Sequence, residues 1–248
     1  MKMPIRILEG PHQAHEPFWR LRDAAGDGEP EMELYGFISE FSWFEDDITP
    51  QKFKDDLYAL GKKGPITVRM HSGGGDVFAA SIIRSTMMDY PGKITIKIDG
   101  LAASAASVVA MAGDVIKMQE TAYMMIHDPT TMAWGSVEEL KKAIDLLKTV
   151  KDGIIDAYHT KTKLETEKIS KMMSDETWMS AKKALSFGFI DEVISTGGKN
   201  PAASFGNTDI VNALKLYANV PAELRILQSP DYDRQAAERF RAEVKILV

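Results

Sequence analysis

Segments with the pattern of strands alternate with segments with the pattern of helices along most of this 248-residue chain. The strand pattern, a short apolar run or an alternation of apolar and polar residues, occurs at residues 31–38, 66–70, 93–98, 115–118, 122–126 and near 192–194. Strands that alternate with helices pair mostly in parallel, and the helices cover the sheet. The sequence therefore predicts an α/β fold for residues 31–195.

The composition changes on both sides of this region. Residues 1–30 mix proline, glycine, histidine and charge, and we expect an N-terminal arm or a short hairpin there. From about residue 196 a glycine-rich linker leads to an apolar patch at 210–217 and then to a charged helical segment. We interpret residues 196–248 as a C-terminal tail that serves assembly or binds a partner.

Charge and composition argue against several classes of protein. The formal net charge of −6 does not suit a general nucleic-acid or anionic-membrane partner. The absence of cysteine excludes disulfides, thiolate metal sites and a cysteine nucleophile. No apolar run has the length of a membrane span and the first residues lack a signal-peptide core, so we expect a cytoplasmic protein. His12 and His15 have no third ligand nearby, and we predict neither a metal nor a cofactor.

The longest predicted helix begins after Ser136, where Ser136 and Glu139 have the spacing of a capping box. Its apolar residues form roughly one stripe, made of Leu140, Ile144, Leu147, Ile154 and Tyr158. The helix is longer than is typical of globular proteins. A long amphipathic helix of this kind often packs against another subunit, so we expect a homo-oligomer.

Three consecutive glycines, Gly73–Gly75, lie between the predicted strand at 66–70 and a helical stretch from Val77 to Tyr90. Glycine loses much conformational entropy on folding, so a simple turn rarely needs three of them. Two functions fit: the glycines cradle a phosphate, or they bring backbone N–H groups up to a reacting carbonyl. The motifs of phosphate-binding loops are absent. A sharp turn with positive φ is the structural alternative.

Ser104 lies where the strand at 93–98 gives way to a short buried helix, and small residues surround it from Gly100 to Ser107. Small neighbours let an extended substrate approach the hydroxyl, and the N–H groups of a helix start favour a developing oxyanion. The alternative is structural, with Ser104 or Ser107 as the N-cap of the helix. The Gly-x-Ser-x-Gly motif of the α/β-hydrolases is absent.

His127 follows the strand at 122–126, and acidic residues Asp175 and Glu176 precede a later helix. The order serine, histidine, acid differs from the orders in chymotrypsin, subtilisin and the α/β-hydrolases. The roles are nevertheless those of a serine protease, in which the histidine takes the serine proton and the acid orients the histidine.

Four motifs in the same order and at similar spacings resemble the ClpP family of serine proteases. They are Ser72–Val77, Gly100–Ser104, Met125–Pro129, and Met179-Ser180-Ala181 with Ala184 and Gly188–Asp191. The resemblance covers about residues 31–195. The glycines followed by Asp-Val-Phe, and Asp-Glu-Thr-Trp before Met-Ser-Ala, are similar to the phage and prophage branch, which resembles head-maturation proteases.

This resemblance implies a spiral of ββα units, as in ClpP and the crotonases, with a protruding handle helix that begins at Ser136. It implies that Ser104 is the nucleophile and His127 the general base, with oxyanion N–H groups from Gly75 and Ala105. It also implies a ring of subunits, a heptamer or two stacked heptamers. The substrate would be a protein or peptide, and by analogy with that branch a phage capsid or scaffold protein.

The chain departs from the ClpP pattern in two motifs and in both flanks. The family acid lies four residues before the serine of Met-Ser-Ala, which is Glu176 here where ClpP has aspartate, and Asp175 stays open as the alternative. Gly73 replaces the usual proline, which loosens the loop. The flanks do not match ClpP, so we do not expect docking of an ATP-driven unfoldase, and we expect the isolated protein to hydrolyse peptides without ATP.

Two other functions fit parts of the sequence. Crotonase-like acyl-CoA enzymes share the implied fold but need no serine–histidine pair, so Ser104 and His127 argue against them. A ring-forming scaffold without catalysis is the second alternative, which the uncertain acid and the extra tail keep open.

Overall fold

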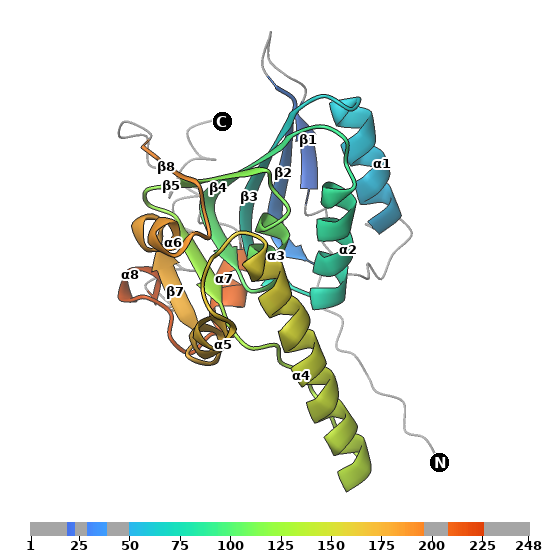
Figure 1. Ribbon diagram of the computed structural model, residues 1–248, viewed down its shortest axis with the longest axis vertical. Coiled ribbons are helices and arrows are strands. Elements are labelled where there is room, and N and C mark those ends of the chain that lie inside the picture. The colour runs from blue at the N-terminus through green and yellow to red at the C-terminus, as the bar shows by residue number, and fades with distance from the viewer. Residues whose placement is uncertain (1–18, 23–28, 39–49, 196–207, 226–248) are drawn as a thin grey trace, which may run out of the picture.

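The computed structural model describes residues 19–22, 29–38, 50–195 and 208–225 (Figure 1). An 8-stranded sheet runs through the molecule in the order β1-β2-β3-β4-β5-β8, and β6 pairs with both β4 and β7. The strands are β1 (Trp19–Arg22), β2 (Glu31–Ile38), β3 (Ile66–Gly75), β4 (Ile94–Ala103), β5 (Val115–Gln119), β6 (Tyr123–Ile126), β7 (Thr177–Ser180) and β8 (Glu192–Ile194). Pairing is parallel except between β1 and β2 and between β6 and β7. The predicted α/β fold is therefore confirmed.

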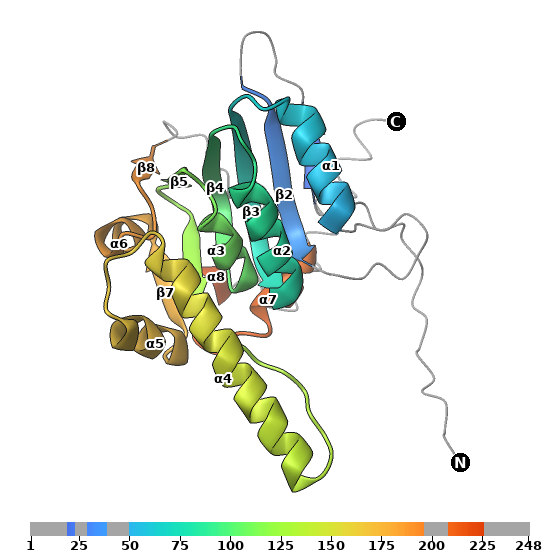
Figure 2. The ribbon, with the colours of Figure 1, turned by 45° about the vertical axis from the view of Figure 1, so that its right-hand side comes forward.

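Helices cover both faces of this sheet. They are α1 (Pro50–Gly61), α2 (Val77–Met88), α3 (Ala105–Ala110), α4 (Val137–His159), α5 (Thr166–Ser174), α6 (Ala181–Phe187), α7 (Thr208–Leu214) and α8 (Ala222–Arg225). Helices α1, α2 and α3 lie together on one face (Figure 2). Because successive side chains of a strand point to opposite faces, Ala102 of β4 packs in the large core beneath these helices, whereas Leu101 and Ala103 pack with α7 and α8 on the other face.

The two central strands are longer than their sequence patterns predict. The predicted strand ends at Met70, and a sharp turn was the structural alternative for the glycines, but β3 continues through Gly75, where it still pairs with Ile38 of β2. Likewise β4 continues to Ala103, beyond the predicted strand at 93–98, and the short buried helix α3 begins at Ala105. Glycine and alanine carry no periodic apolar signal, so only the pairing with neighbouring strands reveals these extensions.

Strand β7 was not predicted, because Thr177–Ser180 is too short for a clear alternation. It pairs antiparallel with β6, and this pairing places Ile126 opposite Thr177. His127 follows Ile126 and Glu176 precedes Thr177, so both lie just beyond the same end of this strand pair and are brought near each other.

Helix α4 begins with the predicted capping box, in which the Glu139 N–H donates to Ser136 Oγ and the Ser136 N–H donates to Glu139 Oε2. Only the C-terminal part of the helix is buried, where Ile154, Ile155, Ala157 and Tyr158 join the core. The N-terminal part projects from the body of the molecule (Figures 1 and 2). Apolar side chains are exposed there, including Val137 at 66% and Ile144 at 52%.

None of the helices in the four described ranges combines the length and the apolar character needed to cross a membrane.

Candidate active site

Ser104 occupies the single residue between β4 and α3. Its backbone has φ 54° and ψ −126°, a conformation that is costly for any residue except glycine. The surrounding backbone holds it there, since the Ser104 N–H donates to the Met125 carbonyl at 2.9 Å and the Ser104 carbonyl accepts from the Ser107 hydroxyl at 2.6 Å. The Ser104 side chain does not cap α3, which removes the structural alternative of an N-cap role for this residue.

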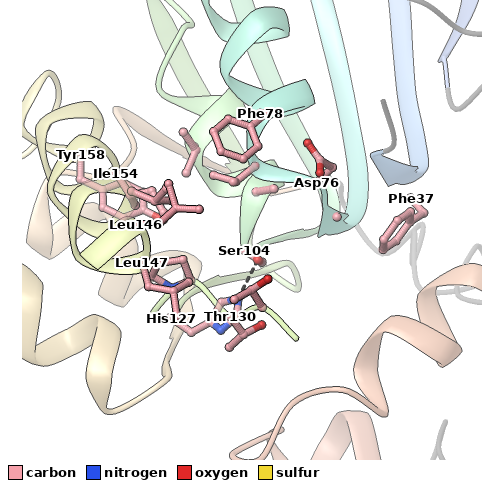
Figure 3. A pocket seen from close by; sticks show the side chains of 17 residues that line it. Phe37, Asp76, Phe78, Ser104, His127, Thr130, Leu146, Leu147, Ile154 and Tyr158 are labelled. Atoms are coloured by element: carbon pink, nitrogen blue, oxygen red, sulfur yellow. Dashed lines mark hydrogen bonds between the residues drawn. The ribbon is translucent and has the colours of Figure 1, made fainter. Parts of the chain in front are cut away.

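The Ser104 hydroxyl faces the imidazole of His127 across the end of the sheet. Strands β4 and β6 pair in register at Ala103 and Met125, and each functional residue follows closely after this pair. Ser104 Oγ lies 2.7 Å from His127 Nε2, the distance of a hydrogen bond (Figure 3). A neutral imidazole with its proton on Nδ1 would accept the hydroxyl proton at Nε2.

Burial lowers the pKa of His127, and the negative charges of Glu176 and Asp128 partly oppose this effect. The lowered pKa favours the neutral imidazole, the form that acts as a base. Asp128 itself faces away from the serine, since its carboxylate pairs with Lys151 at 2.7 Å and accepts from the Ser174 hydroxyl at 2.9 Å.

Glu176 lies close enough to His127 to affect its charge, but its carboxylate is held by other groups. Oε1 accepts from the indole of Trp178 at 3.0 Å and from the Asn219 N–H at 2.7 Å, and Oε2 accepts from the Ala218 N–H at 2.8 Å. Within the described residues no hydrogen bond joins Glu176 to His127. Asp175 instead pairs with Lys171 at 2.8 Å on an exposed surface. Of the two predicted acids, Glu176 is therefore the one that interacts with His127.

The glycine segment at the end of β3 lies against the serine. A Cβ atom on Gly74 would lie 2.6 Å from the Ala103 carbonyl oxygen and 2.8 Å from Ser104 Cβ, and Gly74 has φ 96°. A Cβ atom on Gly75, at φ 146°, would lie 2.0 Å from the Ile38 carbonyl oxygen. Both residues must therefore be glycine for the strand to pass this close to Ser104 and β2.

A pocket of about 450 Å³ opens beside Ser104 and His127 (Figure 3). Gly75 and Ala105, the predicted oxyanion residues, line it together with the serine. Its far wall comes from α3 and α4 and is mostly apolar, with Val108, Leu146, Leu147, Val150, Ile154 and Tyr158. This arrangement suits an extended chain that presents a carbonyl to Ser104 and an apolar side chain to the wall.

Tyr217 and Trp178 are site residues that the sequence analysis missed. The Tyr217 ring packs edge-to-face on the His127 ring with centroids 5.3 Å apart, and it also packs edge-to-face with the Trp178 ring at 5.9 Å. The Tyr217 hydroxyl donates to the Gly73 carbonyl at 2.5 Å. Tyr217 lies in the apolar patch noted at 210–217, but nothing local in the sequence indicates which surface that patch covers.

The described ranges contain no group of three or more histidine, aspartate or glutamate side chains that could hold a metal ion. His12 and His15 lie outside those ranges.

Comparison with known proteins identifies the family of the chain. Residues 46–197 match the family described as Clp protease. The chain belongs to the Clp protease family. The "ATP-dependent Clp protease proteolytic subunit" of Deinococcus radiodurans is 33% identical over 150 residues, which cover 58% of this chain and 73% of that protein. The "ATP-dependent Clp protease proteolytic subunit 2" of Thermobifida fusca is 30% identical over 151 residues, 58% of this chain and 74% of that protein.

The predicted enzyme class, a serine-type endopeptidase, is confirmed by this membership. The family match ends at residue 197, so α7 and α8, with Tyr217, lie beyond it.

Proposed function

We propose that this Clp-family enzyme cuts peptide bonds with Ser104 as the nucleophile and His127 as the general base. The 2.7 Å contact between Ser104 Oγ and His127 Nε2 is the observation that carries the proposal. As the Ser104 oxygen attacks the substrate carbonyl carbon, its proton passes to Nε2. The resulting imidazolium gives that proton to the leaving amine, the peptide C–N bond breaks, and water then hydrolyses the acyl-enzyme by the same two proton transfers.

We assign Glu176 the role of the acid that stabilises the imidazolium. Its charge favours protonated His127, which is the form present after the hydroxyl proton is transferred. We assign the oxyanion N–H groups to Gly75 and Ala105, both of which line the pocket beside the serine. The Ala105 N–H lies at the start of α3, where intrahelical acceptors are missing.

The substrate that suits this site is an unfolded or partner-presented protein segment. An extended segment fits the pocket, and the apolar wall from α3 and α4 favours an apolar side chain next to the cut bond. By analogy with the phage branch of the family, we propose a phage capsid or scaffold protein as the natural substrate.

We also propose that the protein assembles into a ring, a heptamer or two stacked heptamers, through α4. The exposed apolar residues of the projecting part of α4 support this assembly, because an apolar stripe of that length is unfavourable in water. We still predict that the protein hydrolyses peptides without ATP, is cytoplasmic and has no unfoldase partner.

Labelling with a fluorophosphonate probe, read by intact mass and peptide mapping, tests the nucleophile. We expect one adduct on Ser104, which disappears in Ser104→Ala together with peptide hydrolysis, while the assembly stays intact. Ser186→Ala is the matched control, because Ser186 is a serine on α6 whose hydroxyl only donates to the Lys183 carbonyl. Hydrolysis that persists in Ser104→Ala would reject the assignment, and an unlabelled, inactive ring would favour the non-catalytic scaffold.

A further inference from the structure

The segment that contains α7 and α8 packs onto the end of the sheet that carries the active site. Ile210, Val211, Leu214, Val220 and Leu224 are buried in a cluster with Leu101, Ala103 and Met125. Ala103 directly precedes Ser104, and Met125 supplies the carbonyl that holds the Ser104 N–H. This segment therefore supports the strand ends that position Ser104 and His127.

Gly73 fits closely against α7. A Cβ atom on Gly73 would lie only 2.4 Å from Ala213 Cβ. Gly73 has no positive φ within the range that disfavours other residues, so this contact, and not the backbone conformation, is what requires glycine. The departure from the family's proline at this position thus makes room for the C-terminal segment. The sequence analysis expected Gly73 to loosen the loop and did not foresee this packing.

Tyr217 joins three parts of the site. Its ring packs on His127 and Trp178, and its hydroxyl donates to the Gly73 carbonyl. Burial raises the pKa of Tyr217 to about 12, and the nearby Ser104 hydroxyl opposes part of the rise. The phenol is therefore protonated at neutral pH and can donate to Gly73.

The two residues after Tyr217 hold the acid. The N–H groups of Ala218 and Asn219 both donate to the Glu176 carboxylate, and the Asn219 side chain donates to the Asp175 carbonyl at 3.1 Å. Hydrogen bonds to a charged group are about twice as strong as neutral ones. The same short stretch, Tyr217–Asn219, thus contacts both the histidine and the acid.

We propose that the segment Ile210–Arg225 is a working part of the active site and that Tyr217 is the positioning residue that keeps His127 against Ser104. This inference rests on the proposed function of Ser104 and His127. It assigns to a segment beyond the family match a role in the reaction itself, distinct from the assembly role that the sequence suggested for the tail.

The proposal has a consequence for the pH dependence of hydrolysis. Within the described residues, four groups act on His127. The Ser104 hydroxyl lies at hydrogen-bond distance and the Tyr217 ring packs on the imidazole, while the carboxylates of Glu176 and of Asp128, which pairs with Lys151, act through their charge. Loss of the Tyr217 ring admits water to the imidazole, which favours the imidazolium, and the two carboxylates that also favour it stay in place. The acid limb of the pH–rate profile must then move to higher pH, because the base is lost as it becomes protonated.

The experiment measures kcat, KM and the pH profile for Tyr217→Ala and Tyr217→Phe in the full chain, with an unstructured peptide substrate. We expect Tyr217→Ala to lower kcat by roughly 10- to 100-fold with a smaller change in KM, since positioning of a general base acts on the chemical step, and to move the acid limb upward. Tyr217→Phe keeps the ring, so we expect a loss of only a few-fold and an unmoved acid limb. Tyr90→Phe is the matched control, because it removes a hydroxyl bonded to the Gly64 carbonyl away from the site, and we expect wild-type kinetics.

A second pair of variants tests the positioning role even if Tyr217→Ala fails to fold. Gly73→Ala should displace α7, lower kcat and move the acid limb to higher pH, as Tyr217→Ala does. Gly73→Ala combined with Ala213→Gly removes the clashing Ala213 Cβ, so it should restore kcat and the position of the acid limb. Wild-type kinetics in Gly73→Ala, or an unmoved acid limb in a folded Tyr217→Ala, would overturn the positioning role. Faster hydrolysis in either variant would also overturn it and show that the segment covers the site. Failure of the proposed function is recognised separately, because the wild-type enzyme would then lack a fluorophosphonate adduct.

Discussion

At the scale of single residues, the site depends on two backbone conformations that side chains disfavour. Ser104 and Glu176 both have positive φ, at 54° and 47°, although neither is glycine. Such conformations cost about 1–3 kcal/mol each and persist only where the surrounding structure holds them. Here strand pairing and hydrogen bonds hold each residue, and each conformation directs a functional side chain toward His127 or its neighbours. Lys62 and Lys63, in the turn after α1, also have positive φ, so the conformation alone does not mark a functional residue; for Ser104 and Glu176 it is their position beside His127 that supports their assignment to the reaction.

The choice between the two acids can be tested by isosteric substitution. Glu176→Gln removes the charge that favours protonated His127, and we expect kcat to fall by about 10-fold or more. The acid limb of the pH–rate profile should move to lower pH, because the pKa of His127 loses the effect of that charge and falls further. Asp175→Asn is the matched control, since that carboxylate pairs with Lys171 at the surface, and exposed pairs of this kind are worth about 1 kcal/mol or less. Steady-state kinetics between pH 5 and 8 would measure both, and a larger loss in Asp175→Asn would reverse the assignment.

At the scale of elements, the end of β3 shows why three glycines are retained. The strand continues through Gly75 while it approaches β2 on one side, the β4–α3 junction on another and α7 on a third. Ser72 anchors this stretch, because its hydroxyl donates to the Gly36 carbonyl at 2.6 Å and accepts from the Gly74 N–H at 3.1 Å. Each glycine has a different neighbour, so the three substitutions should not be equivalent.

Gly74→Ala and Gly153→Ala provide a matched test of this argument. In Gly74→Ala the new Cβ clashes with the Ala103 carbonyl, and the alanine must adopt the positive φ of Gly74. We therefore expect the unfolding free energy to fall by at least about 1–2 kcal/mol and hydrolysis to be largely lost. At Gly153, within α4, a Cβ meets nothing within 4 Å, so we expect a gain of about 0.5–1 kcal/mol with unchanged kinetics. Denaturant unfolding and peptide hydrolysis would measure both effects. Equal stability of the two variants would contradict the close packing at Gly74.

At the scale of the whole molecule, the sequence predicts the order of elements better than their partners. Local patterns were enough for β2, for the start of α4 and for the position of Ser104 at a strand–helix junction. The approach of His127 to Ser104 was expected from the family resemblance, since sequence spacing alone does not pair β4 with β6. The position of Tyr217 depends on packing between segments that are distant in the chain. No local pattern encodes that packing, and the match to the family ends at residue 197, before it.

The proposed ring assigns the contact between subunits to the projecting part of α4. Leu140 and Ile144 are 39% and 52% exposed and lie four residues apart, on the same side of the helix. If these side chains are buried between subunits, a charge at Ile144 must be desolvated there, so Ile144→Asp should shift the protein from the ring to smaller species in size-exclusion chromatography with light scattering. Lys142→Asp puts the same charge on a different side of α4, because residues two apart on a helix do not face the same way, and should leave the assembly unchanged. An Ile144→Asp protein that keeps the wild-type mass would exclude this part of α4 from the subunit interface, and assembly would then have to depend on other surfaces of the domain.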